Sequence, residues 1–226
     1  QYVHAALLLL KRQKGLRLEN ATLGVVGVGH VGSRVARMAG ELGMKVLLND
    51  PPRADKGEQG FVDLATIARE CDVITFHTPL NREGAYRTYH LAGEEFLFSL
   101  ARTPFVINSS RGEVVDTASL LSALSAGKVK DVVIDTWENE PDINRELLSA
   151  AFLATPHIAG YSADGKANAT RMSLEALCRF FGIEADFTIL PPEGPSDYDP
   201  TRDSDWLKAS PEKFEWFRGN YPIRRE

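Results

Sequence analysis

Residues 27–32, GVGHVG, carry three glycines in the spacing G-x-G-x-x-G, between a β-branched apolar run and a segment with helical spacing. Glycine triplets occur in many turns, but at a strand-to-helix junction this spacing is the dinucleotide-binding fingerprint. Gly27 permits the tight turn, Gly29 lets the backbone approach a pyrophosphate, and Gly32 lets helix and strand pack closely. The amides that open the helix would then face the negative diphosphate. This stretch predicts a Rossmann-type domain that binds a dinucleotide.

An acidic residue at the end of the next strand indicates which dinucleotide is bound. Asp50 ends KVLLND, 18 positions after Gly32, close to the separation of about 20 residues that the fingerprint requires. A carboxylate there can accept both ribose hydroxyls of NAD and would repel the 2′-phosphate of NADP. Arg53 weakens that discrimination, and Asp50 could instead only open the turn at Pro51 and Pro52. We predict NAD as the cofactor.

Short apolar, β-rich runs alternate with helical patterns along most of the chain. The predicted strands are residues 22–28, 45–49, 72–77, 104–110, 131–137 and 151–156. A Pro-rich loop follows the second strand, and helical spacing covers residues 31–42, 63–70, 116–127 and 164–181. Continuous apolar strands separated by helices predict a parallel sheet covered on both faces. We therefore expect an α/β fold with a doubly wound parallel sheet.

Charge and cysteine content argue against several classes of protein. The formal net charge is −5 without a long basic run, so no nucleic-acid partner is expected. Cys71 and Cys178 lie far apart without a CxxC pair, which argues against a zinc site and against a disulfide-stapled secreted fold. The apolar run at residues 5–10 is too short to cross a bilayer and lacks the charged flank of a signal peptide. We expect a cytoplasmic protein with no metal and no membrane contact.

Three chemical groups follow predicted strands. Arg111, in NSSRGEVVD, could hold a carboxylate bidentately, and His157, in LATPHIAGYS, could transfer a proton near neutral pH. A carboxylate bonded to that imidazole would hold the ring in one tautomer, and the loop WENEP offers both Glu138 and Glu140. Each residue alone could be an ordinary loop residue. Because the carboxyl ends of parallel strands bind ligands, the three groups beside a dinucleotide site predict hydride transfer from a secondary alcohol.

Two further histidines lie near the predicted cofactor site. His77 ends the third strand, in HTPL, where the rim of an adenine pocket would lie. A solvated strand-end residue is an equally good interpretation of His77. His30 lies between two glycines of the fingerprint and is expected to be an exposed turn residue rather than a chemical group.

The blocks GVVGVGHVG, HTPL, INSSRGEVVD, DTWENEP and TPHIAGYS resemble the successive blocks of the D-isomer-specific 2-hydroxyacid dehydrogenases. The resemblance covers residues 23 to about 183 and is looser after position 190. It implies that Arg111 orients the substrate carboxylate, that Glu140 rather than Glu138 pairs with the histidine, and that His157 is the acid/base. It also implies that Asp135 contacts the nicotinamide carboxamide and that the substrate is a small phosphorylated 2-hydroxy acid.

The fingerprint and the resemblance together define the expected contacts. The residues expected to bind NAD are Gly27, Gly29, His30, Val31, Gly32, Asp50, Thr78, Pro79, Ser109, Ser110, Arg111, Asp135, His157 and Gly160. The residues expected to bind the substrate are Arg111, His157 and Tyr161. Two alternatives stay open: a module that senses NAD(H) or acts as a co-repressor, as some relatives of this family do, and a dehydrogenase for another D-2-hydroxy acid such as phosphoglycerate.

Four segments are expected along the chain. Residues 1–18 resemble a linking helix from an N-terminal substrate domain that is missing or truncated, and residues 19–160 form the NAD-binding domain. Residues 161–190 would be the helix that returns to the substrate domain. Residues 191–226 are rich in proline and also carry aromatic residues, which disordered tails usually lack. We interpret this last segment as a small, incomplete C-terminal dimerisation appendage and expect a homodimer.

Overall fold

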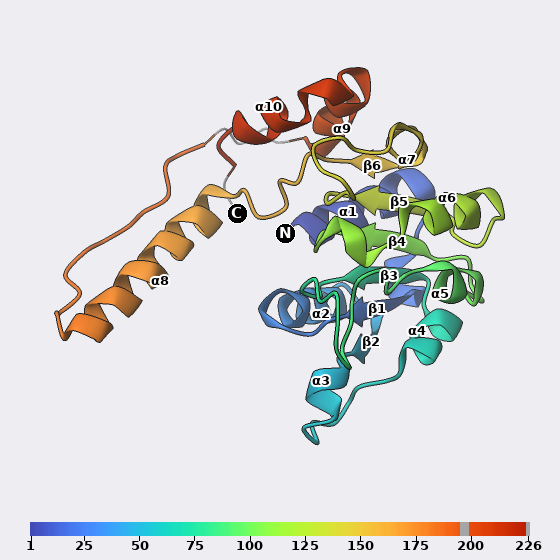
Figure 1. Ribbon diagram of the computed structural model, residues 1–226, viewed down its shortest axis with the longest axis horizontal. Coiled ribbons are helices and arrows are strands. Elements are labelled where there is room, and N and C mark those ends of the chain that lie inside the picture. Colours follow the sequence, from blue (N-terminus) through green and yellow to red (C-terminus); the bar gives the residue numbers. More distant parts are fainter. Residues whose placement is uncertain (195–198, 225–226) are drawn as a thin grey trace.

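The computed structural model describes residues 1–194 and 199–224. Its six strands form one parallel sheet in the order β2-β1-β3-β4-β5-β6 (Figure 1). The strands are β1 (Thr22–Val26), β2 (Lys45–Asn49), β3 (Val73–Phe76), β4 (Phe105–Asn108), β5 (Asp131–Ile134) and β6 (Leu153–Ala154). The α/β fold with a doubly wound parallel sheet is therefore confirmed. Each observed strand lies within the range expected for it.

Strand residues alternate between two apolar cores, one on each face of the sheet. In β5, Val132 and Ile134 pack into one core and Val133 into the other, as the two-residue repeat of a strand requires. The first core is covered by α4 (Leu64–Glu70), α5 (Glu94–Phe98), α6 (Thr117–Ser125) and α7 (Arg145–Ala150). The second is covered by α1 (Tyr2–Lys14) and α2 (His30–Glu41). Burial on both faces explains why these strands are continuous apolar runs.

The chain changes its direction of winding between β1 and β3. β1 pairs with β2 on one side and with β3 on the other, so the connections after β1 and β3 leave in opposite directions. Such a switch point leaves a crevice at the carboxyl ends of the strands, where doubly wound sheets bind ligands. Gly27 follows β1 and His77 follows β3, and their amides bond to the carbonyls of Asn49 and Val26 at 2.8 and 2.7 Å. The glycine loop therefore lies at this crevice.

The Pro-rich stretch after β2 differs from the expected loop because it contains the short helix α3 (Pro51–Ala54). Asp50 is its N-cap, and the side chain accepts a hydrogen bond from the backbone N–H of Arg53 at 3.2 Å. Pro51 and Pro52 open the helix, where the missing N–H of a proline costs little. A capping carboxylate followed by two prolines thus starts a helix here instead of a turn.

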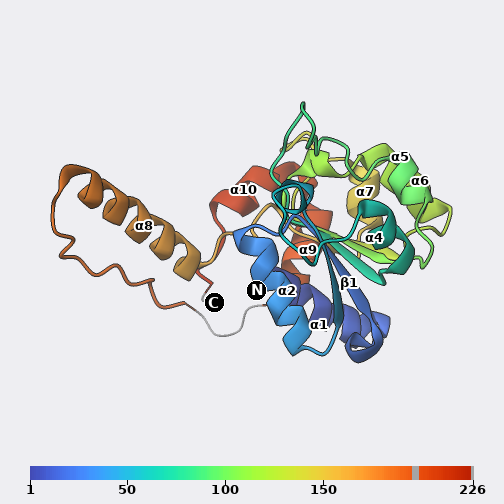
Figure 2. The same ribbon diagram turned by 90° about the horizontal axis from the view of Figure 1, so that it is seen from below.

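The longest helix, α8 (Ala163–Phe181), projects away from the sheet (Figures 1 and 2). It begins at the capping hydroxyl of Ser162 and ends at Gly182, whose φ is 66°. The described residues also form three short 3-10 helices: η1 (Leu18–Asn20), η2 (Gly112–Val114) and η3 (Pro211–Lys213). Among the described residues, no helix has both the length and the apolarity needed to span a bilayer.

Two helices near the end of the chain, α9 (Pro200–Ala209) and α10 (Phe214–Gly219), return to the sheet beside β6 (Figure 1). Leu207 and Phe214 are buried in the first core. The hydroxyl of Ser204 accepts a hydrogen bond from the Ala154 N–H at 3.0 Å, so it pairs a donor on the edge strand that would otherwise be open. Within the expected dimerisation segment 191–226, residues 195–198 and 225–226 lie outside the described residues.

Candidate active site

The three fingerprint glycines have three different surroundings. Gly27 has a φ of +88°, and a Cβ there would lie 2.8 Å from the backbone of His77 and of Thr78. A Cβ on Gly32 would lie 2.0 Å from the carbonyl oxygen of Gly27. A Cβ on Gly29 would meet nothing within 4 Å, so open space faces this part of the backbone. The loop bends at Gly27, packs at Gly32 and leaves room for a ligand at Gly29.

Asp50 and Arg53 hold the glycine loop from the neighbouring strand. Oδ2 of Asp50 accepts the N–H of Val28 at 2.8 Å, and Nη1 of Arg53 donates to the Val28 carbonyl at 2.7 Å. Nε of Arg53 also donates to Glu58 at 2.9 Å. An ionised carboxylate has about four acceptor positions, so Asp50 keeps capacity for ribose hydroxyls. The guanidinium of Arg53 is paired with a carboxylate, which disfavours its use for the 2′-phosphate of NADP.

A cleft of about 390 Å³ opens at the switch point. Its lining includes residues from the ends of three strands: Gly27, Gly29, Asp50, His77, Thr78 and Pro79. Burial lowers the pKa of His77 to about 4, so this ring is neutral, and its Nε2 lies 3.0 Å from the hydroxyl of Thr75. Oγ1 of Thr78 is buried without a hydrogen-bond partner among the described residues. An open backbone at Gly29 and an unpaired hydroxyl in the same cleft fit a bound NAD.

At the other end of the carboxyl edge, His157 is bonded to Glu140. Nδ1 of His157 lies 2.8 Å from Oε2 of Glu140, and Oε1 of Glu140 accepts the N–H of Trp137 at 2.8 Å. The indole of Trp137 is buried and donates to the Thr155 carbonyl at 2.9 Å. The backbone therefore orients the carboxylate, and the carboxylate orients the ring. Across the described part of the chain nothing bonds to Nε2 of His157, which leaves that atom open to a substrate.

Asp135 organises the loop that carries His157. It is fully buried, and its carboxylate accepts bonds from the hydroxyl of Thr155 at 2.6 Å and from the N–H groups of Ile158 and Ala159 at 2.8 and 2.9 Å. Burial raises the pKa of Asp135, and these hydrogen bonds act in the opposite direction. They support the positive φ of 55° at His157, which is uncommon for a residue with a side chain. The contact of Asp135 with the nicotinamide stays a prediction.

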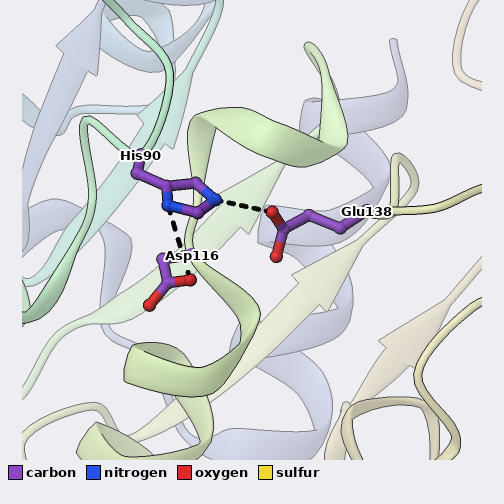
Figure 3. A group of neighbouring side chains, drawn as sticks. All are labelled: His90, Asp116 and Glu138. Carbon is purple, nitrogen blue, oxygen red and sulfur yellow. Dashed lines mark hydrogen bonds and ion pairs between the residues drawn. The ribbon is translucent and has the colours of Figure 1, made fainter.

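Glu138, the other acid of the WENEP loop, points to a different histidine. Its Oε1 lies 2.6 Å from Nε2 of His90 (Figure 3). Its Oε2 accepts the N–H of Thr117 at 2.8 Å. Nδ1 of His90 lies 3.6 Å from Oδ1 of Asp116. The structure therefore pairs Glu140, and not Glu138, with His157. His90 played no part in the sequence-based site, because its partners are far away in the sequence and no local pattern marks it.

The group of His90, Asp116 and Glu138 offers ligand atoms that lie within 4.8 Å of one another. Each ring nitrogen of His90 faces a different carboxylate (Figure 3). An imidazole can give a metal ion only one of its two nitrogens. In His90 both ring nitrogens are directed at carboxylates. The arrangement is that of a histidine linking two acids at the start of α6.

Arg111 follows β4 in a turn that other residues hold in place. The amide of Asn108 donates to the Arg111 carbonyl at 2.9 Å, and its oxygen accepts the Ser110 N–H at 3.2 Å. A Cβ on Gly112 would lie 1.9 Å from the Trp137 carbonyl oxygen, so a side chain there would push the Arg111 turn off the Glu140 loop. The side chain of Arg111 is exposed and donates to the Ser110 carbonyl at 2.6 Å. In the described chain it has no carboxylate partner.

The remaining residues of the expected site surround these groups. Val31 opens α2 and is 61% exposed, and Gly160 is exposed, so that a Cβ there would meet nothing within 4 Å. Tyr161 is half-buried, and its ring meets that of Tyr221 edge-on at 6.4 Å. Ser109 is half-buried, next to the Arg111 turn. These positions all lie at the carboxyl ends of the strands, as expected.

A parallel sheet with this fingerprint, and with a histidine–glutamate pair at the same edge, defines an NAD-binding dehydrogenase domain. The chain belongs to the D-isomer specific 2-hydroxyacid dehydrogenase family, whose NAD binding domain matches residues 7–159. It is 54% identical to the erythronate-4-phosphate dehydrogenase of Bacteroides fragilis, over the whole chain and 69% of that relative. It is 52% identical to the protein of the same name in Bacteroides thetaiotaomicron, with the same coverage.

Solved structures agree with this assignment. D-lactate dehydrogenase from Aquifex aeolicus, complexed with NAD and lactic acid, is 27% identical with a TM-score of 0.67. The similarity covers 84% of this chain and 69% of that one. The NAD cofactor predicted from the glycine fingerprint and Asp50 is thereby confirmed.

Proposed function

We propose that this chain catalyses the NAD-dependent oxidation of 4-phospho-D-erythronate to 2-oxo-3-hydroxy-4-phosphobutanoate, a step in pyridoxal 5′-phosphate biosynthesis. The observation that carries this proposal is the His157–Glu140 pair at the edge of an NAD-binding sheet. The relatives that are 52–54% identical over the whole chain share one enzyme name, which supports the choice of substrate. That agreement favours this reaction over a sensing module or a dehydrogenase for another acid.

The residues of the site divide the chemistry among them. His157 removes the proton of the C2 hydroxyl through its open Nε2, and Glu140 keeps the ring in the matching tautomer and stabilises the imidazolium that forms. Arg111 holds the C1 carboxylate with two parallel hydrogen bonds. NAD, when bound, accepts the hydride from C2. Holding the alcohol between a fixed base and a fixed cation makes the reaction effectively unimolecular.

The cofactor would be held by the residues that line the cleft and the glycine loop. The amides at the start of α2, including those of His30 and Val31, would face the pyrophosphate. Asp50 would accept ribose hydroxyls, and the unpaired hydroxyl of Thr78 would bond to the cofactor. Changing Asp50 to Ala should therefore weaken NAD binding without removing proton transfer. Calorimetric titration with NAD and NADP measures this.

The domain organisation is also a proposal. We infer that residues 19–160 are the NAD-binding domain and that residues 1–18 and 161–190 are helices leading to and from a substrate domain. Large apolar side chains on α8 support this, since Met172, Leu177 and Phe180 are 61%, 52% and 82% exposed. We further propose a cytoplasmic homodimer in which residues 191–226 contribute to the interface. Light scattering on the purified protein, with and without residues 191–226, tests the oligomeric state.

The decisive experiment follows NADH absorbance with 4-phospho-D-erythronate, 3-phospho-D-glycerate and D-lactate. We expect turnover with the first and values of kcat/KM at least about a hundredfold lower with the other two, a difference of about 2.7 kcal/mol in barrier. Preference for phosphoglycerate or lactate would replace the substrate assignment. Tight NADH binding with no turnover of any of the three would contradict the proposed activity.

A further inference from the structure

Two cationic side chains from different elements meet at one aromatic ring beside the histidine loop. Nζ of Lys166, in the first turns of α8, lies 4.2 Å from the centroid of the Tyr161 ring. Cζ of Arg218, in α10, lies 5.9 Å from the same centroid. The N–H of Tyr161 donates to the Ile158 carbonyl at 2.9 Å, so the ring belongs to the turn that begins at His157. Two positive charges thus gather at the edge of the active site.

The charges of this pair are only partly compensated. Arg218 approaches Glu215 at 3.5 Å, the long end of a hydrogen bond, and the side chain of Glu215 is 57% exposed. Nε of Arg218 is buried and has no hydrogen-bond partner within the described residues. Lys166 is exposed and forms no ion pair with any carboxylate of the described chain. The protein has a net charge of −5, yet these two cationic side chains keep donors without an acidic partner in the described chain. Such donors indicate a site that binds an anion.

The pair lies on the same side of the molecule as the catalytic acid. The pKa of Arg218 is raised: burial opposes its charge, but the phenol of Tyr161 and the carboxylates of Glu215 and Glu140 outweigh that effect. The carboxylate of Glu140, the partner of His157, is thus among the charges that raise the pKa of Arg218. Arg111 follows β4, whereas His157 and Tyr161 both follow β6, so the Lys166–Arg218 pair lies at the strand end that carries the histidine and Arg111 lies two strands away.

A nearby arginine, Arg224, has a different, structural role. Nη2 of Arg224 donates to the carbonyls of Ile158 and Ala159 at 3.2 and 3.3 Å, and the residue is only 7% exposed. Its own carbonyl accepts the N–H of Ala163 at 2.7 Å. Arg224 therefore supports the turn on which Tyr161 lies, and Lys166 and Arg218 are the two cations at the Tyr161 ring.

We propose that Lys166, Arg218 and the hydroxyl of Tyr161 form the subsite for the phosphate of the substrate; this rests on the proposed function. A phosphorylated four-carbon acid carries an anion at each end, and one cation cannot hold both. Arg111 takes the carboxylate, and the Lys166–Arg218 pair takes the phosphate. A guanidinium binds phosphate oxygens in parallel, while an ammonium adds a compact charge. The pair selects phosphorylated over unphosphorylated 2-hydroxy acids.

The test compares Lys166→Gln, Arg218→Gln and the double variant on 4-phospho-D-erythronate and on D-erythronate. We expect each single change to lower kcat/KM for the phosphorylated acid about ten- to a hundredfold, mainly through KM, because a charge-assisted contact is lost. For D-erythronate kcat/KM should change less than about threefold. Lys166→Arg and Arg218→Lys should restore part of the loss. Arg69→Gln, which removes a charge on α4 far from the site, is the matched control.

Inorganic phosphate gives a readout that does not depend on turnover. The unaltered protein should bind phosphate, and the double variant should bind it at least about tenfold more weakly in a phosphate titration at constant ionic strength. Equal losses on both acids would mean that the residues support folding or the histidine turn, and the phosphate assignment would be wrong. Unchanged kinetics on both acids would also overturn it. Phosphate binding that depends on the pair, without turnover, would contradict the proposed reaction and leave the subsite standing.

Discussion

Two histidine–glutamate pairs use the same loop of this protein. Residues 137–143 supply Glu140 to His157, with an Nδ1–Oε2 distance of 2.8 Å, and Glu138 to His90, with an Nε2–Oε1 distance of 2.6 Å. Both histidines have positive φ angles, 55° and 52°. Their side chains are also similarly exposed, at 26% and 30%. By distance, backbone and burial the two pairs are nearly alike.

They differ in the second ring nitrogen. Nε2 of His157 has no bonding partner in the part of the chain that the structure describes, whereas Nδ1 of His90 lies 3.6 Å from Asp116. A histidine with one carboxylate is oriented and still has a nitrogen to offer a substrate. The ring of His90 instead directs one nitrogen at Glu138, at 2.6 Å, and the other at Asp116, at an ion-pair distance of 3.6 Å. The free nitrogen, more than the carboxylate, distinguishes a candidate acid/base from a structural link.

The largest expected effect is that of His157→Ala. Turnover should fall about a thousandfold, because general acid–base catalysis contributes about 10²–10⁴. The affinity for NAD should change less than about threefold, which fluorescence titration with NADH measures. His90→Ala is the matched variant and should keep turnover within about threefold. If His157→Ala kept a tenth of kcat, only about 1.4 kcal/mol of barrier would be lost, too little for the assigned role.

The next largest effect is expected when one of the two glutamates is replaced by glutamine. Glu140→Gln should lower kcat/KM about a hundredfold, since an amide cannot stabilise the imidazolium as a carboxylate does. Glu138→Gln makes the same chemical change two positions away and should lower kcat/KM less than about threefold. Steady-state rates at saturating NAD decide between them. Equal losses for both variants would mean that the two pairs act as one unit.

A third histidine, His77, has no carboxylate partner among the residues that the structure describes, and its pKa is lowered to about 4 by burial. An unfolded chain takes up this proton below about pH 6.5, whereas the folded protein does not. Stability should therefore be lost as the pH falls from about 6.5 to about 4, by up to about 1.4 kcal/mol per pH unit from this residue. Urea unfolding of wild type and His77→Gln at several pH values measures the contribution. Parallel pH profiles for the two proteins would refute it.

The smallest expected effect is that of the His90–Glu138 pair on the free energy of unfolding. His90→Ala should lower the free energy of unfolding by about 1 kcal/mol, because two half-buried carboxylates lose the group between them. Adding Glu138→Gln should recover part of that loss, as residues in one network are not additive. Exposed His30→Ala is the control and should change stability by less than about 0.5 kcal/mol. A loss in His90→Ala that Glu138→Gln does not change would argue against coupling.

Several features of the fold could be predicted because their causes are local. The apolar runs, the helical spacing and the glycine fingerprint each depend on neighbouring residues, and every observed strand falls within its predicted range. The positions of Arg111 and His157 followed from the same reasoning, since both come directly after strands of one parallel sheet. Asp50 was also placed at the end of β2, although its capping of α3 was not anticipated.

Other features depend on contacts that the local pattern does not contain. The residues of the WENEP loop left Glu138 and Glu140 open, and only the family resemblance selected Glu140; the physical cause is the loop conformation, including the φ of 59° at Asn139. His90 lies 48 positions from Glu138, and no periodicity links them. Gly112 is needed because the Trp137 backbone passes within 1.9 Å of where its Cβ would be. These relations arise only when separate strands bring their loops together.

The sequence by itself determined the parallel sheet, the NAD site and the strand ends that carry the chemistry. It could do so because the pattern of hydrophobic burial and the geometry of turns depend on residues that are close together in the sequence. The family resemblance named Glu140 as the partner of His157, and the tertiary structure shows the contact. Only the tertiary structure decided that Arg53 is paired with Glu58 and that Lys166 and Arg218 converge on Tyr161. Those outcomes depend on the directions of side chains across loops that are distant in the chain.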